Sequence, residues 1–314
     1  MVNFIFSILI PSYKKKYFDD CLKSILYQTY QNYEVIIVDD ASPEDLKSVA
    51  DSFQDDRIRY YRNERNCGAL NVVDNWNICL GYATGDYVIC MGDDDKLLPG
   101  ALEEYAKMIE KYPNVDVFHG WTEVIDEHSD VINLLDTRPE WESVYSLMWQ
   151  RWNGRQQFIG DFLFKTATLR KNGGFYKQPL AWGSDDITAY INAKENGVAN
   201  TQVSVFQYRQ TSITLSSISN GKIKLEALEK EKLWTESFLS HSSVRNDLDR
   251  LLLDLLTRNM NARFEKRKID TITKDVKFSN SILKRVVYWI KLYRSLNISS
   301  SQFVKAILKG ISQH

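Results

Sequence analysis

Short apolar runs alternate with helical segments over the first hundred residues, and this alternation limits the fold more than any other feature of the sequence. The apolar runs lie at residues 4–10, 33–38, 58–61 and 86–91, and apolar residues recur at helical spacing in the intervening segments 17–28, 44–53 and 75–83. Repeated strand and helix with short connections is typical of a parallel sheet covered by helices on both faces. The sequence therefore predicts an α/β fold with a mostly parallel central sheet.

Polar residues directly follow three of these predicted strands. They are Pro11, Ser12 and Tyr13 after the first strand, Asp39 and Asp40 after the second, and Asp93, Asp94 and Asp95 after the fourth. Ligands of open α/β sheets bind beyond the carboxyl ends of the strands. We therefore expect the three clusters to converge on one cleft.

The run Asp93-Asp94-Asp95 places three negative charges side by side, and these repel one another unless a cation binds there. Two carboxylates on one turn supply the hard oxygen ligands that Mg²⁺ and Mn²⁺ prefer. A solvated acidic turn is the alternative. The position of the run at a strand end, in line with the two other polar clusters, favours a Mn²⁺ or Mg²⁺ site that holds a diphosphate.

Composition excludes several classes of protein. The chain has 314 residues, a formal net charge of −1 and 44% hydrophobic residues, so it can bury a substantial core and is not a disordered chain. No apolar run approaches the ~18 residues that a membrane-spanning helix requires. Residues 4–10 lack a basic flank and are closed by Pro11, which fits a strand better than a signal peptide. We expect a cytoplasmic protein with four free cysteines and no nucleic-acid partner.

The chain changes character after Tyr208 and Arg209. Segments 222–264 and 280–311 are long, helical and charged, so we place a domain boundary near residue 216. Residues 262–314 carry 12 Lys and Arg against 3 Asp and Glu, a net charge of +9, which leaves −10 for residues 1–261. The predicted domains are residues 1–216 and a mainly α-helical region at residues 217–314, and they are expected to face different partners.

Several motifs occur in a fixed order along the first two-thirds of the chain. They are SILIPSY at 7–13, SILYQTY at 24–30, VIIVDDASP at 35–43, ATGDY at 83–87, GDDD at 92–95, GGF at 173–175 and SDD at 184–186. In this order they resemble the family 2 inverting glycosyltransferases with a GT-A (Rossmann-like) fold. The resemblance extends to about residue 215, and it implies a nucleotide-sugar-binding half at 1–98 and an acceptor-binding half at 99–216.

The resemblance implies a role for each polar cluster. Pro11, Ser12, Tyr13 and Asp39 would line the nucleotide pocket, and Asp40 would accept a hydrogen bond from the base, most often uracil. Asp93 and Asp95 would hold the metal ion on the diphosphate, with Asp94 near the ribose or the donor sugar. The implied reaction transfers a sugar from a nucleotide-sugar donor, most often a UDP-sugar, to a saccharide or lipid-linked saccharide in bacterial-type surface polysaccharide synthesis.

The resemblance also implies a general base. Asp185 is the favoured residue and Asp186 its rival, because a carboxylate must take the proton of the acceptor hydroxyl as it attacks. A helix N-cap is the alternative role of Asp185. Two positions depart from the family pattern: Ser184 replaces an acid, and residues 210–212 lack a common histidine. The residue that completes the metal shell therefore stays open.

Trp182 lies three residues before Asp185 and is either a core residue or a stacking platform for an acceptor sugar. Two other function classes compete with sugar transfer. Nucleotidyl transfer would normally require a Gly-rich basic loop after the first strand, but lysines 14–16 follow it without a glycine. A non-catalytic carbohydrate-binding protein would not need the intact acid clusters.

The C-terminal helices interleave apolar and basic residues. This pattern predicts either a peripheral contact with an anionic membrane at its inner face, or packing on the chain's own catalytic domain or in a homo-oligomer. The apolar residues are Ile282, Val286, Val287, Trp289, Ile290, Leu292, Tyr293, Leu296, Phe303, Ile307 and Leu308, and the basic residues are Lys284, Arg285, Lys291, Arg294, Lys305 and Lys309.

Overall fold

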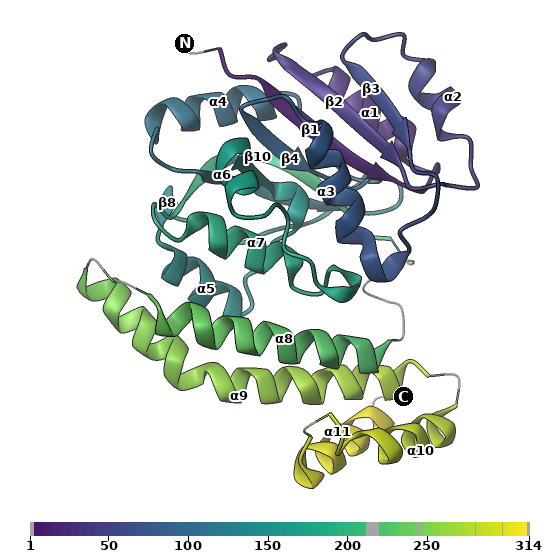
Figure 1. Ribbon diagram of the computed structural model, residues 1–314, viewed down its shortest axis with the longest axis vertical. Coiled ribbons are helices and arrows are strands. Elements are labelled where there is room, and N and C mark those ends of the chain that lie inside the picture. Colours follow the sequence, from purple (N-terminus) through teal and green to yellow (C-terminus); the bar gives the residue numbers. More distant parts are fainter. Residues whose placement is uncertain are drawn as a thin grey trace. The chain divides into compact units, whose positions relative to one another are not determined.

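The structure is a computed structural model that describes residues 3–211, 220–242, 244, 246–279, 281–296 and 298–312. The chain forms two compact units, Met1–Ile213 and Thr214–His314 (Figure 1). The boundary that we predicted near residue 216 lies outside the described residues.

The first unit is built on one sheet whose strands follow the order β3-β2-β1-β4-β9-β6-β10-β5, with β7 paired to β6 and β8 to β10. The strands are β1 (Phe6–Ser12), β2 (Tyr33–Asp39), β3 (Ile58–Arg62), β4 (Tyr87–Cys90), β5 (Lys96–Leu97), β6 (Val117–Ile125), β7 (Val131–Leu134), β8 (Trp141–Glu142), β9 (Phe162–Lys165) and β10 (Val198–Arg209). Strands β1 to β4 run parallel, as do β6 and β10. Strand β9 lies antiparallel between β4 and β6, so it joins two parallel blocks. The predicted α/β fold is confirmed, with β9 as an antiparallel insertion.

Helices cover both faces of this sheet (Figure 1). They are α1 (Phe18–Leu26), α2 (Leu46–Asp51), α3 (Val72–Tyr82), α4 (Ala101–Lys111), α5 (Val144–Trp152), α6 (Thr166–Lys171) and α7 (Ser184–Ala193), with short 3₁₀ turns η1 (Ala69–Asn71), η2 (Ile159–Asp161) and η3 (Pro179–Ala181). Alternate strand residues such as Ile8, Ile10 and Val35 pack in one core with residues of α1, α2 and α4. Helix α3 contacts β1 and β2. Consecutive residues of β1 and β2 are buried and mostly apolar. Since side chains alternate across a strand, both faces of these two strands are therefore apolar.

The second unit consists of helices among its described residues. They are α8 (Gly221–Ser240), α9 (Asp247–Lys277), α10 (Ile282–Leu292) and α11 (Ser300–Ser312). Helix α9 contacts the other three helices, and its residues Phe264, Ile272 and Val276 are buried. Buried Trp289 of α10 donates a hydrogen bond to Asp275 at 2.9 Å.

The predicted long helical segments are each divided in two. Helix α8 ends at Ser240 and α9 begins at Asp247, where the side chain of Asn246 accepts a hydrogen bond from the backbone N–H of Asp249 at 2.8 Å. This N-cap starts a new helix, which the charge pattern alone did not predict. Within the described ranges, no helix combines the length and the apolarity needed to cross a bilayer.

Candidate active site

The carboxyl ends of β1, β2 and β4 meet at one edge of the sheet. The backbone N–H of Asp40, after β2, donates to the carbonyl of Ser12 in β1 at 2.9 Å. Asp93, after β4, accepts hydrogen bonds at one oxygen from the backbone N–H groups of Tyr13 at 2.7 Å and Lys14 at 2.8 Å. The predicted convergence of the three polar clusters is therefore confirmed. Pro11 lies in β1 beside β2.

Asp40 is held in place by a loop that the motifs did not single out. One carboxylate oxygen accepts from the side-chain amide of Asn63 at 2.8 Å and from the backbone N–H of Cys67 at 2.9 Å. Asn63 in turn donates to Asn75 of α3 at 3.0 Å. These contacts orient the Asp40 carboxylate.

Asp39 has a different environment from its neighbour. It is fully buried, and its oxygens accept from the backbone N–H of Ser42 at 2.7 Å, from the hydroxyl of Tyr60 at 2.6 Å and from Arg62. Both oxygens are thus engaged by the protein. Asp39 therefore stabilises the turn after β2 that carries Asp40.

The acidic turn buries two carboxylates. Asp93 and Asp95 are 8% and 6% exposed, and an oxygen of Asp95 accepts from the backbone N–H of Arg209 at 2.9 Å. Burial and the charge of Asp94 raise the pKa of Asp93 to about 6 and raise that of Asp95. The described residues contain no cluster of three or more metal-ligating side chains. Asp93 and Asp95 carry the hard carboxylate oxygens that a divalent ion prefers.

Arg209 lies beneath this turn with its side chain fully buried. Its guanidinium donates to the carbonyls of Asp94 at 2.8 Å and Asp126 at 2.9 Å, and it lies 4.3 Å from the ring centre of Tyr17. Arg209 therefore brings a fixed positive charge to the acidic turn. The sequence marked Arg209 only as the point after which the chain changes character, and no local pattern connected it with the acidic turn.

Asp185 and Asp186 open helix α7, and the structure separates their roles. Asp186 is buried and accepts from Nε of Arg151 at 2.8 and 3.1 Å and from the side chain of Gln157 at 2.8 Å. Asp185 keeps partial exposure. Burial and the charge of Asp186 raise the pKa of Asp185 to about 7, which suits a proton acceptor near neutral pH. Arg151 and Gln157 were missed because no local pattern connects them with α7.

The N-cap role that we considered for Asp185 is wrong. Gly183 occupies the N-cap position with φ +82°, and no side chain caps the helix. Buried Ser184, which replaces a family acid, accepts at its hydroxyl from the backbone N–H of Gln178 at 3.1 Å. Ser184 thereby ties the preceding loop to the start of α7.

Trp182 lies in that loop and is partly exposed. Leu180 and Ala181, directly before it, have φ values of +60° and +52°, a left-handed conformation that is costly for these residue types. The turn η3 contacts η1, next to the Cys67 that holds Asp40. The loop with Trp182 thus reaches the loop that holds Asp40.

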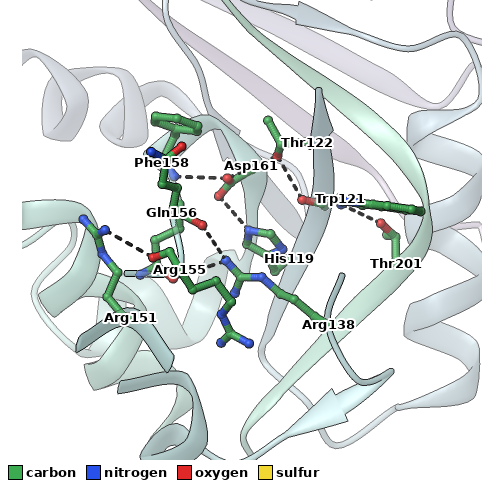
Figure 2. A network of polar contacts seen from close by, with 12 residues as sticks. His119, Trp121, Thr122, Arg138, Arg151, Arg155, Gln156, Phe158, Asp161 and Thr201 are labelled. Carbon is green, nitrogen blue, oxygen red and sulfur yellow. Dashed lines mark hydrogen bonds and ion pairs between the residues drawn. The ribbon is translucent and has the colours of Figure 1, made fainter. Parts of the chain in front are cut away.

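A buried polar network supports the segment that carries Gln157 (Figure 2). Asp161 accepts from the backbone N–H of Phe158 at 3.0 Å and from Thr122 at 3.2 Å, and it lies 3.2 Å from Nε2 of His119. Burial and nearby arginines lower the pKa of His119 well below its usual value, so the ring is neutral. The ring of Phe158 stacks on Tyr208, next to Arg209, at 3.7 Å between centres. Gln157 of this segment binds Asp186, and its neighbour Phe158 packs on Tyr208 beside Arg209. The segment thus links α7 with the acidic turn.

Comparisons with known proteins agree with this geometry. Residues 7–171 match the family model for glycosyl transferase family 2. The putative glycosyltransferase EpsE of Bacillus subtilis is 33% identical over 226 residues, which cover 68% of this chain and 78% of EpsE. The GalNAc(5)-diNAcBac-PP-undecaprenol beta-1,3-glucosyltransferase of Campylobacter jejuni is 37% identical over 99 residues, 31% of each chain. For several curated relatives the match covers only about a third of their length.

The fold also matches solved structures. The crystal structure of Staphylococcus aureus TarS 1-349 in complex with UDP-GlcNAc superposes with a TM-score of 0.65 and 15% sequence identity. The superposition covers 98% of this chain and 90% of that one. This similarity confirms the predicted GT-A-like architecture.

Proposed function

The chain belongs to glycosyltransferase family 2, and we propose that it transfers a sugar from a UDP-sugar to a saccharide or lipid-linked saccharide acceptor in bacterial-type surface polysaccharide synthesis. The convergence of Asp40, Asp93 and Asp95 on one edge of the sheet is the observation that carries this proposal. The name of the Campylobacter relative specifies an undecaprenol-linked acceptor, and TarS was crystallised with UDP-GlcNAc. Family membership favours sugar transfer over nucleotidyl transfer and over a non-catalytic role.

Asp40 would accept a hydrogen bond from the uracil base. One oxygen of Asp40 is engaged by Asn63 and Cys67, so the carboxylate is oriented before the nucleotide arrives. Pro11, Ser12 and Tyr13 would line the same pocket. Asp39 would contribute indirectly, by holding the turn.

Asp93 and Asp95 would hold a Mn²⁺ or Mg²⁺ ion, with Asp94 beside the ribose or the donor sugar. When bound, such an ion supplies charge stabilisation of the departing diphosphate. Arg209 would keep the turn in shape, because it binds the turn at the backbone of Asp94 and at Asp95.

Asp185 would act as the general base. Its raised pKa lets it take the acceptor proton near neutral pH, whereas Asp186 is committed to Arg151 and Gln157. Attack by the activated hydroxyl opposite the leaving group would invert the anomeric centre. Trp182, three residues before the base, would stack on the acceptor sugar. A lipid-linked acceptor would be met at a membrane surface, where the enzyme would act as a peripheral protein.

A donor screen tests the proposal. The full chain is incubated with Mn²⁺, a lipid-linked saccharide acceptor and each of a panel of UDP-, GDP- and dTDP-sugars, and release of nucleoside diphosphate is measured. We expect acceptor-dependent release from at least one UDP-sugar, and a higher KM for that donor in Asp40→Ala. Release from GDP- or dTDP-sugars alone would refute the UDP assignment, and the absence of release from every donor would refute sugar transfer to this acceptor class.

A further inference from the structure

The two C-terminal helices each expose an apolar stripe. In α10 the stripe consists of Leu283, Val287 and Ile290, which are 76%, 44% and 53% exposed. In α11 it consists of Val304, Leu308 and Ile311, which are 52%, 63% and 46% exposed. Both sets follow the spacing i, i+4, i+7, so each forms one face of its helix. Helices α10 and α11 thus repeat the same exposed apolar pattern.

Cations accompany both stripes. Lys284 directly follows Leu283, and Lys305 directly follows Val304, so each stripe has a lysine at the same place. Residues 281–312 contain six Lys and Arg and no Asp or Glu. Arg285 and Lys309 contact acids of α9, whereas Lys284, Lys291 and Lys305 form no ion pair with any described residue. The charged side chains of α10 and α11 themselves are therefore all positive.

The opposite faces of these helices are fixed by packing. Trp289 of α10 is fully buried and bonded to Asp275 of α9. Gly310 of α11 lies so close to α9 that an added Cβ would be 2.8 Å from Val276. Trp289 and Ile307, two of the apolar residues in the predicted pattern, are buried in this packing. The exposed stripes are thus the outward faces of helices whose inner faces are already occupied.

We propose that this surface, which we call the basic stripe surface and define as Leu283, Lys284, Val287, Ile290, Lys291, Val304, Lys305, Leu308 and Ile311, docks on an anionic lipid bilayer. Apolar side chains of an interfacial helix enter the boundary between headgroups and acyl chains, while flanking cations bind anionic headgroups. A second copy of the chain is a poorer partner, since a two-fold contact through this surface would bring like charges together. The inference concerns vesicle binding, which does not require that the proposed sugar transfer be correct.

Vesicle co-sedimentation of the full-length protein tests the inference. The probes are phosphatidylcholine vesicles and vesicles of three parts phosphatidylcholine to one part phosphatidylglycerol, at low and at physiological salt. We expect binding to the anionic vesicles, weakened by salt because headgroup attraction is screened. Neutral vesicles should bind at least about tenfold less protein, since each cation near an anionic surface contributes about fivefold.

Two double variants separate the apolar and the electrostatic contributions. Leu283→Gln with Leu308→Gln should lower the vesicle partition coefficient about tenfold or more, because two large apolar side chains no longer enter the bilayer. Lys284→Gln with Lys305→Gln should lower it about 25-fold on anionic vesicles only. Matched controls carry the same substitutions at exposed positions of α8 and α9. They are Leu233→Gln with Leu251→Gln, and Lys230→Gln with Lys266→Gln, and they should bind as the wild type does.

Light scattering after gel filtration identifies the other possible occupants. A dimer that Leu283→Gln with Leu308→Gln dissociates, together with no vesicle binding, would overturn the proposal in favour of a second copy. A monomer that fails to bind anionic vesicles would overturn it as well. Equal binding to neutral and anionic vesicles would overturn the assignment of the lysines. Circular dichroism of each variant verifies that it is folded.

Discussion

Nε of Arg151 lies 2.8 and 3.1 Å from the two carboxylate oxygens of Asp186. Gln157 adds a third hydrogen bond to the same carboxylate at 2.8 Å. Among the described residues, no side chain makes a comparable set of hydrogen bonds to the neighbouring Asp185, although Arg151 lies close enough to lower its pKa. Of two adjacent acids, Asp186 is thus fixed by the protein, and this favours Asp185 as the proposed base.

This division predicts different effects of the two isosteric substitutions. Asp185→Asn should lower kcat by about 10²–10⁴-fold with nucleotide affinity nearly unchanged, because a base acts on the acceptor and not on the diphosphate. Asp186→Asn should lower the free energy of unfolding by about 1–3 kcal/mol, because Arg151 loses its charged partner. Kinetics with titration calorimetry of UDP, and urea unfolding, measure these effects. An inactive Asp186→Asn beside an active Asp185→Asn would exchange the two roles.

The pH dependence of kcat should show one acidic limb near pH 7. Burial and the charge of Asp186 raise the pKa of Asp185 to about 7, so the base is protonated and inactive below that value and ionised above it. The folded protein also holds this proton more tightly than the unfolded chain. Asp185 should therefore lower stability as the pH rises from about 4 to about 7.

Arg151→Gln should move that limb to higher pH. Its positive charge lowers the pKa of Asp185, and its removal leaves the charge of Asp186 uncompensated. Arg151→Lys, which keeps the charge but not the contact through Nε, serves as the control and should shift the limb less. An unchanged limb in Arg151→Gln would show that another group titrates.

Metal dependence should follow from the acidic turn. EDTA should abolish turnover of the wild type, and added Mn²⁺ should restore it. Asp95→Asn should lower transfer at least about 10²-fold, because a metal ion supplies several kcal/mol of stabilisation to the leaving group. Asp19→Asn, at an exposed acid of α1, should have no effect. Full turnover in EDTA would contradict the role of Asp93 and Asp95.

Local sequence patterns were enough to predict most of the fold and the positions of the polar clusters. Apolar runs that end in polar residues predicted β1, β2 and β4, and the rule for strand ends predicted that Asp40 and Asp93 converge. The supporting contacts could not be predicted in this way. Arg151 is 35 residues from Asp186, and Arg209 is 114 residues from Asp95, so only the folded chain brings them together. The antiparallel position of β9 likewise depends on tertiary pairing.

The long-range contact of Arg209 leads to a prediction about stability. Its guanidinium is fully buried and satisfies the carbonyls of Asp94 and Asp126. Arg209→Gln should lower the free energy of unfolding by about 3 kcal/mol, because the acidic turn loses its buried positive charge and the carbonyls of Asp94 and Asp126 each lose a donor. Urea unfolding measures this change.

The same substitution should raise the KM of the donor, because the turn with Asp93 and Asp95 is no longer held for the diphosphate. Arg209→Lys should recover only part of the stability, since an ammonium group cannot reproduce the planar donor geometry of a guanidinium. Arg250→Gln changes an exposed arginine in the same way and should stay within about 0.5 kcal/mol of the wild type. An Arg209→Gln variant as stable as Arg250→Gln, with an unchanged donor KM, would show that the acidic turn does not depend on this cation.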